Sequence, residues 1–305
     1  MKAFVKRSAA PDDIALEEVK IPSINDDELL VRVKAVGVGI HDSYFLPQEI
    51  SYPYPIGIEA AGVVDEIGSQ VTRFQKGDRI AFVSMMQPKG GTWAEYAAVQ
   101  QDSLILPIPE SMEFAEAAAV PVAGNTVMRA LTALHLNEGD SVFIAGASGA
   151  IGTFAIQFAK ARGWKVAGSA SPKNHDYMKS LGADKTVDYR DPNWADEIRE
   201  WMPGGVDAAI AIQPGTGTES MHVVKDSGTV ITISGDRIEP ERGITAAFVP
   251  HKADVRDEIE ALIQQIADGT YQLVIEQTYP FEQGLEALQK TQTRHARGKL
   301  VLTLD

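Results

Sequence analysis

The first third of the chain carries short apolar runs separated by segments that contain Gly and Pro. Such runs occupy residues 1–5, 29–33, 60–64 and 79–83. Runs of this length with turn residues between them are typical of β-strands. Many short strands in succession predict a barrel-like β domain over residues 1–115.

The pattern changes near Phe114, where an Ala-rich stretch leads into alternating strand and helix signals. Residues 113–134 favour helix, and Pro121 predicts a break because proline cannot continue a helix begun before it. Further along, the expected strands are 141–145, 165–168, 206–212, 228–233 and 300–304, and the expected helices are 151–162, 174–181 and 257–267. Strands that alternate with helices predict an α/β fold with a doubly wound parallel sheet.

The charge balance narrows the classes of partner. The 305 residues include 42 acidic and 28 basic side chains, which gives a formal net charge of −14. Because this field repels phosphate backbones and anionic lipids, we expect neither nucleic acid nor a membrane as partner. No apolar run approaches the roughly 20 residues that span a bilayer, and no secretory signal opens the chain. Cysteine is absent, which excludes disulfides and thiolate metal sites and suits a cytoplasmic protein.

A glycine-rich segment follows the first strand of the α/β region. Gly146, Gly149 and Gly152 stand at three-residue intervals between this strand and a helix, and Ser148, Ala150 and Ile151 lie within the same turn. A tight turn without Cβ atoms lets a pyrophosphate approach the backbone, and the helix N-terminus then offers unpaired N–H groups. The segment therefore predicts a dinucleotide site.

The end of the next strand distinguishes the two nicotinamide cofactors. An NAD site usually carries Asp or Glu there, which binds the ribose 2′-hydroxyl. Here Ser169, Ser171 and Lys173 follow, and the first carboxylate comes at Asp176. Hydroxyls and an ammonium attract a 2′-phosphate, and Tyr189 at the end of the third strand is expected near the same ribose. The sequence favours NADPH.

Several segments together resemble the medium-chain dehydrogenase/reductase superfamily, in its zinc-free quinone oxidoreductase branch related to zeta-crystallin. They are the glycine turn 145–152, the segments 169–171 and 181–184, the Gly-Thr-x-Ala-Glu-Tyr stretch 91–96 and the closing motif 295–302. The resemblance implies a GroES-like domain over residues 1–115, a Rossmann domain over 116–260 and a return of residues 261–305 to the first domain. It also implies a homodimer, for which 228–233 and 244–249 are apolar enough to supply a sheet edge.

The resemblance also bears on metal. Zinc-dependent relatives carry a Cys ligand and a His ligand at two positions where this chain has Gly39 and Ile58. Catalytic zinc needs three protein ligands. We therefore expect no metal, and we interpret Glu59 as a structural or cleft carboxylate.

The family's substrate segment aligns with residues 38–44. Tyr44 and Asp42 match its tyrosine and acid, Gly39 replaces its asparagine, and His41 adds a titratable group. The resemblance implies that Tyr44 contacts the substrate, and water, Tyr44 or His41 could supply the proton. Each of the two residues also has a purely structural interpretation, as a packing aromatic or a loop histidine.

Three further residues are candidates for the reaction site. Asn125 opens the helix before the Rossmann strand and is expected to face the nicotinamide or the substrate. Arg297 and Lys299 could reach cofactor phosphates, or could be a solvated basic pair.

These observations predict an NADPH-dependent oxidoreductase that transfers a hydride to a quinone, an enone or a similar activated small molecule. An enoyl-thioester or 2-alkenal reductase is an alternative, because the same fold and hydride chemistry serve both. A nonenzymatic, crystallin-like NADPH-binding protein is a second alternative. The sequence does not select the substrate or the proton donor.

Overall fold

The computed structural model describes residues 1–84, 86–250 and 255–305. They form two compact units. Unit 1 comprises Met1–Val122, Arg256–Thr270 and Ile275–Asp305, and unit 2 comprises Ala123–Val255 and Tyr271–Val274. The chain thus leaves unit 1 after its β-rich segment and later returns to it.

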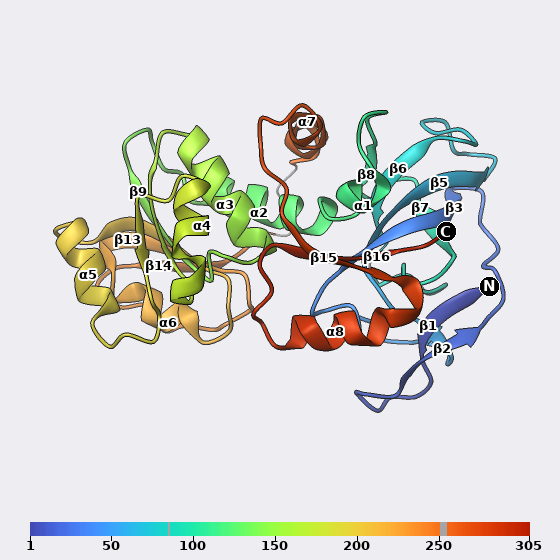
Figure 1. Ribbon diagram of the computed structural model, residues 1–305, viewed down its shortest axis with the longest axis horizontal. Helices are drawn as coiled ribbons and strands as arrows, with labels where there is room; N and C mark the ends of the chain where they lie inside the picture. The colour runs from blue at the N-terminus through green and yellow to red at the C-terminus, as the bar shows by residue number, and fades with distance from the viewer. Residues whose placement is uncertain (85, 251–254) are drawn as a thin grey trace. The chain divides into compact units, whose positions relative to one another are not determined.

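Unit 1 is built on antiparallel sheet (Figure 1). A seven-stranded sheet has the path β15-β16-β3-β5-β6-β8 with β7 also paired to β3, and a smaller sheet has the order β2-β1-β4. The strands are β1 Lys2–Lys6, β2 Ile14–Glu18, β3 Glu28–Val38, β4 Tyr54–Pro55, β5 Glu59–Ile67, β6 Arg79–Val83, β7 Tyr96–Gln100, β8 Ile105–Pro107, β15 Ile275–Pro280 and β16 Lys299–Thr303. Register shifts within the β3–β5 ladder let β3 bend enough to pair with three strands.

The core of unit 1 is apolar and contains the large rings. Trp93 and Phe4 are fully buried and meet edge to face, with ring centroids 5.6 Å apart. Phe281, from the returning segment, packs against Phe4 at 5.3 Å. The helices of this unit are α1 Phe114–Ala117, α7 Arg256–Ala267 and α8 Gly284–Gln292, with a short 3-10 turn at Phe281–Gln283. The residues after 275 therefore complete the first core.

The strand β16 connects the returning segment to the central strand. It runs parallel to β15 and antiparallel to β3, and Leu300 lies opposite Val38. Its residues Leu300, Val301 and Leu302 are buried. The expected strand 300–304 is thus present, one residue earlier, inside the sheet.

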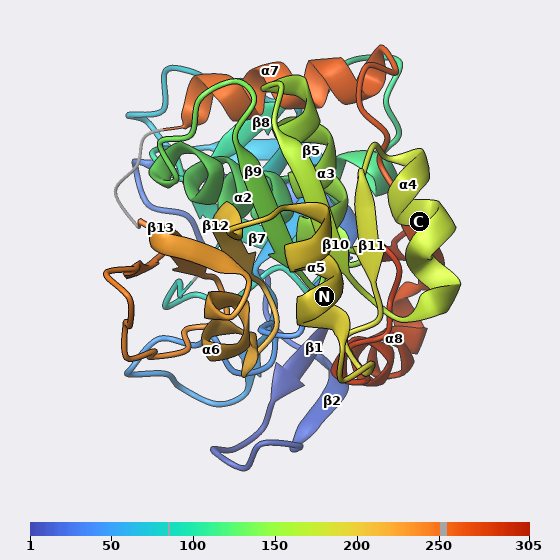
Figure 2. The ribbon, with the colours of Figure 1, turned by 90° about the vertical axis from the view of Figure 1, so that its left-hand side faces the viewer.

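Unit 2 is a six-stranded parallel sheet in the order β11-β10-β9-β12-β13-β14, with helices beside it (Figure 2). The strands are β9 Ser141–Ala145, β10 Lys165–Ser169, β11 Lys185–Val187, β12 Val206–Ala211, β13 Val224–Thr232 and β14 Thr245–Phe248. The helices are α2 Pro121–Ala133, which starts at the unit boundary, α3 Ala150–Ala161, α4 His175–Ser180, α5 Trp194–Trp201 and α6 Thr216–Met221, with a 3-10 turn at Pro172–Asn174. The predicted α/β fold with a doubly wound parallel sheet is confirmed.

The central strand of this sheet is β9. It has β10 on one side and β12 on the other, so the strand order changes direction at its carboxyl end. Ligands of open α/β sheets bind at such a point. The glycine-rich segment begins here, at Gly146. The helix break is also as expected, because α1 ends at Ala117 and α2 begins at Pro121.

Among the described residues, no helix has both the length and the apolar character needed to cross a membrane.

Candidate functional site

The glycine turn has the geometry of a phosphate-binding loop. Gly146 follows β9 with φ of 87°, a conformation that favours glycine. A Cβ atom on Gly152 would come within 2.5 Å of the Ala147 backbone, so only glycine lets helix α3 pack this closely on the turn. The carbonyl of Ser169 accepts from the N–H groups of Gly146 and Ala147, at 3.2 and 3.0 Å, and ties the turn to β10.

The start of α3 suits an anion. Gly149 is the N-cap and contributes no side-chain hydrogen bond, so the first N–H groups of the helix, on Ala150 and Ile151, have no side-chain cap. A Cβ on Gly149 would meet only the Gly146 carbonyl, at 3.9 Å, which leaves space over the turn. Since the helix dipole adds positive potential there, the turn fits a cofactor pyrophosphate.

A second group of residues surrounds the ends of β10 and β11. Ser148 Oγ accepts from Asn174 Nδ2 at 3.1 Å, so this hydroxyl is tied to the turn before α4. Ser169 and Ser171 are buried, whereas Lys173 is exposed on the 3-10 turn Pro172–Asn174.

Arg190 joins the residues that the sequence singled out here. Its Nη2 donates to Ser171 Oγ at 3.0 Å and to the Tyr189 hydroxyl at 3.1 Å. Its Cζ lies 5.0 Å from the centroid of the Tyr189 ring, within cation–π distance. The structure thus brings Ser171, Tyr189 and Arg190 together, and this cluster is cationic. Sequence reasoning stopped at Tyr189 and missed the arginine that follows it.

The predicted substrate end lies in unit 1, in the turn after β3. The His41 ring lies 5.2 Å from that of Tyr44 and 5.4 Å from that of Phe45, centroid to centroid. Tyr44 is 56% exposed and Phe45 is 42% exposed, which is unusual for aromatic residues without a partner surface. The turn therefore presents a group of accessible rings.

Electrostatics set the protonation of two of these rings. The pKa of His41 is lowered by partial desolvation of the ring and by the positive charges of Arg294 and Lys299, although the residue as a whole is exposed. The pKa of Tyr44 is raised, chiefly by desolvation. Near neutral pH we therefore expect a neutral imidazole and a protonated phenol.

Asp42 belongs to the same turn as these rings and is 1% exposed. Its Oδ2 accepts from the Gly39 N–H at 2.7 Å and from Trp93 Nε1 at 3.0 Å, and these bonds hold the turn. Burial raises the pKa of Asp42 to about 7, and the negative charge of Glu59 also raises it. The positive charge of Lys299 and the two hydrogen bonds oppose this shift. Asp42 is consequently a buried carboxyl that exchanges a proton near neutrality.

Lys299 and Glu59 form a buried ion pair. The Lys299 ammonium donates to Glu59 Oε1, and both side chains are less than a tenth exposed. Glu59 Oε2 accepts from the Val122 N–H at 2.7 Å and so caps the first turn of α2. A Cβ on Gly37 would come within 2.3 Å of the Ala118 carbonyl oxygen and 2.8 Å of the Glu59 side chain, which explains the glycine. The ammonium of Lys299 is thus buried against a carboxylate, which favours this pair over a cofactor phosphate as its partner.

The two other candidates lie in different units. Asn125 is half-buried in the part of α2 that belongs to unit 2, and Arg297 is half-buried in the turn before β16. Across the described ranges 1–84, 86–250 and 255–305, no group of three His, Cys, Asp or Glu residues is arranged to hold a metal ion.

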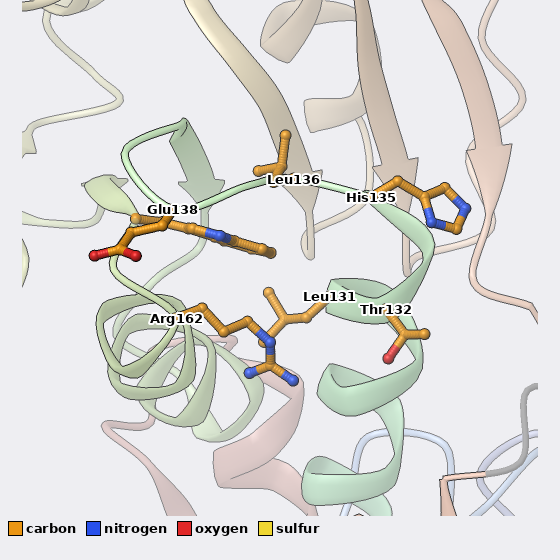
Figure 3. Close-up of a pocket in the computed structure, with 7 residues that line it drawn as sticks. Leu131, Thr132, His135, Leu136, Glu138 and Arg162 are labelled. Carbon is orange, nitrogen blue, oxygen red and sulfur yellow. The ribbon is translucent and has the colours of Figure 1, made fainter.

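A cavity of about 360 Å³ lies elsewhere in unit 2 (Figure 3). Leu131 and Thr132 reach it from the end of α2, and Arg162 from the end of α3. The glycine turn is at the opposite end of α3, roughly 18 Å away for a helix of this length. None of the candidate site residues lines this cavity.

Comparison with known proteins agrees with this geometry. The family model described as "Alcohol dehydrogenase GroES-like domain" matches residues 25–110, and the model described as "Zinc-binding dehydrogenase" matches residues 181–302. A quinone oxidoreductase from Sus scrofa is 30% identical to the chain over 324 residues, which cover 98% of this chain and 96% of that protein. The chain belongs to the medium-chain dehydrogenase/reductase superfamily, in the zinc-free quinone oxidoreductase branch.

Two further relatives extend the comparison for this medium-chain dehydrogenase/reductase. The chloroplastic NADPH-dependent alkenal/one oxidoreductase of Arabidopsis thaliana is 30% identical over 99% of this chain and 79% of that protein. The solved structure of the quinone oxidoreductase from Coxiella burnetii superimposes with a TM-score of 0.88, at 25% identity, over 100% of this chain and 99% of that one. The chain is an oxidoreductase, and its Rossmann sheet and glycine turn are those of a nicotinamide dinucleotide site. The GroES-like and Rossmann predictions are confirmed.

Proposed function

We propose that this protein uses NADPH to reduce an activated double bond of a small molecule, a quinone, an enone or an alkenal. The observation that carries the cofactor choice is the cluster of Ser171, Tyr189 and Arg190, where a guanidinium is held beside two hydroxyls at the end of the Rossmann strands. An arginine fork beside two hydroxyls suits a phosphate dianion better than a ribose 2′-hydroxyl, because only the phosphate carries a charge that pairs with the guanidinium.

The cofactor supplies the hydride when it is bound. The protein's part is to bind it and orient it. The backbone of the glycine turn, from Gly146 to Gly152 with Ser148 beside it, would hold the pyrophosphate. Ser169, Ser171 and Lys173, together with Tyr189 and Arg190, would surround the adenosine 2′-phosphate. Arg297 is a further candidate for a phosphate contact.

Reduction of an enone or quinone leaves negative charge on an oxygen, which needs a hydrogen-bond donor and then a proton. Tyr44 fits the donor role because its raised pKa keeps the phenol protonated at neutral pH. His41, whose pKa is lowered, is mostly neutral and would position the Tyr44 ring, which it contacts, or pass on a proton from water. Asn125 would orient the amide of the nicotinamide or the substrate.

No metal is needed for this chemistry, and we propose that none is bound. Gly39 and Ile58 stand at the two positions where the zinc-dependent relatives carry ligands. Positive charge near the turn of His41 comes from Arg294 and from Lys299, which Glu59 holds in place.

A turnover screen tests the proposal. Oxidation of NADPH is followed by its absorbance with a panel of quinones, enones, alkenals and enoyl thioesters, beside a thermal-shift measurement with NADPH alone. We expect turnover with at least one activated substrate and a stabilising shift. A shift without turnover across the panel would favour the nonenzymatic, crystallin-like binding protein. Turnover confined to thioesters would favour the enoyl-thioester reductase.

We further propose a cytoplasmic homodimer. The sheet of unit 2 ends at β14, a strand of apolar and small residues whose Phe248 is 49% exposed. An open strand edge of this kind can pair with the same edge of a second copy. The other segment expected at the edge, β13, lies inside the sheet between β12 and β14.

A further inference from the structure

The register of two strands brings together two turns that are far apart in sequence. In the antiparallel pair of β16 with β3, Leu300 lies opposite Val38. The residues just before Lys299 and those just after Val38 therefore leave the sheet at the same end, where neighbouring strands are about 4.8 Å apart. The turn that contains Arg294 thus adjoins the turn that contains His41 and Tyr44.

The first of these turns is basic. Arg294, His295, Arg297 and Lys299 fall within six residues, in a chain whose net charge is −14. Lys299 is buried against Glu59, and Arg294 is exposed at the surface. The positive charge of Arg294 acts on both rings: it contributes to the lowered pKa of His41, and it opposes the desolvation that raises the pKa of Tyr44. Because a Coulomb interaction weakens with distance and with solvent, this shared influence agrees with the strand register, which brings the turn of Arg294 to the same end of the sheet as the turn of both rings.

The second turn is aromatic. His41 contacts Tyr44 and Phe45, and the latter two are about half exposed. Flat, accessible rings suit an apolar or conjugated ligand, and an adjacent guanidinium suits an anion. A neutral quinone would use the rings and leave the guanidinium without a role in recognition.

We propose that Arg294 recognises an anionic group on the substrate, so that the physiological substrate is a conjugated carbonyl compound that carries a negative charge. This inference rests on the proposed function and narrows its substrate class. The anion has two chemical sources: a carboxylate attached to the acceptor itself, as in a 4-oxo-2-enoate, or the phosphates of a thioester carrier. We favour the carboxylate, because it is bonded directly to the reacting double bond and one guanidinium suffices to bind it.

Matched substrate pairs test the proposal. The efficiency kcat/KM is measured for a 4-oxo-2-enoate against its neutral methyl ester, and for an enoyl-coenzyme A against the neutral N-acetylcysteamine thioester. The variants are Arg294→Gln and Arg294→Lys, with Arg32→Gln as control. Arg294 has φ of 58°, and Gln and Lys both carry a side chain at this left-handed position as Arg does, so they bring no new type of backbone strain. Arg32 is exposed on the same strand β3, about 20 Å from Val38 at the spacing of a strand.

We expect the wild-type protein to prefer the carboxylate over its ester by about tenfold or more, the range of one charge-assisted contact. Arg294→Gln should remove this preference while it changes the rate with the neutral ester by less than about twofold, and Arg294→Lys should keep part of it. Arg32→Gln should behave as wild type. A preference seen only in the thioester pair would overturn the choice of a carboxylate in favour of a carrier phosphate. The proposal would be overturned if the wild-type protein reduced the charged and the neutral substrate of each pair with equal kcat/KM. It would also be overturned if Arg294→Gln lowered kcat/KM for the charged and the neutral substrate equally.

A binding measurement separates this inference from the proposed function. Calorimetry with a saturated keto acid and its methyl ester, in the presence of NADPH, needs no turnover. Tighter binding of the keto acid that depends on Arg294 would support the anion site even if no substrate were reduced, in which case only the proposed reaction would fail. Equal binding of acid and ester would overturn the anion site whatever the turnover screen shows.

Discussion

The ammonium of Lys299 donates to the carboxylate of Glu59 in a buried ion pair that joins β16 to β5. The other oxygen of Glu59 accepts from the Val122 N–H at the start of α2. One carboxylate therefore connects two strands and a helix. Each buried charge is stabilised by the other. If one partner is removed, the remaining ion still has the free-energy cost of burial but no longer has the attraction that offsets this cost.

Lys299→Met is expected to lower the free energy of unfolding by about 3–5 kcal/mol, since it leaves Glu59 buried without its cation. In Lys299→Met/Glu59→Gln no ion remains, and the amide oxygen can still accept from Val122, so most of the loss should be recovered. Urea unfolding of the single and double variants measures both. If the double variant lost as much unfolding free energy as the two single variants lose together, the pairing would be contradicted.

Arg190→Gln is expected to weaken NADPH binding by about tenfold to hundredfold and NADH binding little, because only NADPH offers a 2′-phosphate to the guanidinium. Lys173→Gln should act in the same direction with a smaller effect, since its side chain is exposed and better solvated. Titration with each cofactor gives the dissociation constants. Lys165→Gln, at the opposite end of β10, is the control. If Arg190→Gln weakened both cofactors equally, the 2′-phosphate assignment would be lost.

Asp42 predicts a pH-dependent stability. Its pKa is raised to about 7 in the folded protein from an ordinary value near 4, so the folded state binds this proton more tightly than the unfolded state. The stability linked to Asp42 is fully present below about pH 4 and is lost as the pH rises through about 7. Asp42→Asn keeps an oxygen for Gly39 and Trp93 but cannot ionise, so it should remove this loss, which is on the order of a few kcal/mol.

Unfolding of wild type and Asp42→Asn at about pH 5 and about pH 8 checks the sign. The variant should gain stability relative to wild type at the higher pH. A variant that gained relative stability at the lower pH would show that Asp42 is ionised in the folded protein across this range.

Removal of metal is expected to leave turnover unchanged. Gly39 and Ile58 supply no ligand, and the chain has no cysteine. Activity before and after dialysis against a strong chelator, with elemental analysis of the purified protein, provides the measurement. Zinc at one atom per chain, or activity restored only by zinc, would contradict the expectation.

The edge strand β14 predicts how assembly can be broken. A Lys in place of the exposed Phe248 adds a charge where two copies of the strand would meet, and should shift a dimer towards monomer by light scattering at micromolar concentration. Phe45→Lys, at an exposed aromatic outside the sheet of unit 2, controls for the charge itself. A wild-type monomer would refute the proposed dimer.

Features encoded within a short stretch could be predicted from the sequence. The glycine turn is one of these, because the strand, the residues without Cβ and the helix follow one another within about twenty residues. The strand β9 was expected at the residues where it occurs, and β10 and α3 within one residue at either end. By contrast, α5 was not expected, although Trp194, Ile198 and Trp201 stand at helical spacing along it and pack on the core of unit 2.

Partners distant in sequence could not be predicted. Glu59 lies 240 residues from Lys299, and nothing local to either residue indicates the other. The sequence therefore left Lys299 either at a cofactor phosphate or in a solvated basic pair. Arg190 was missed for a related reason, since its position beside Ser171 depends on how two separate strand ends meet. The pattern of apolar positions determines which strands form, but the pairing of charges follows from their register.

The position of β16 also has a consequence for synthesis. A ribosome completes residues 1–122 and all of unit 2 before it reaches residue 299. Until then β3 lacks one of its three neighbours, and Glu59 lacks its cation. Nascent chains halted before residue 299 would thus contain a complete Rossmann unit and a first unit whose strand edge is open and prone to aggregation. We expect protease to cleave such chains in the first unit.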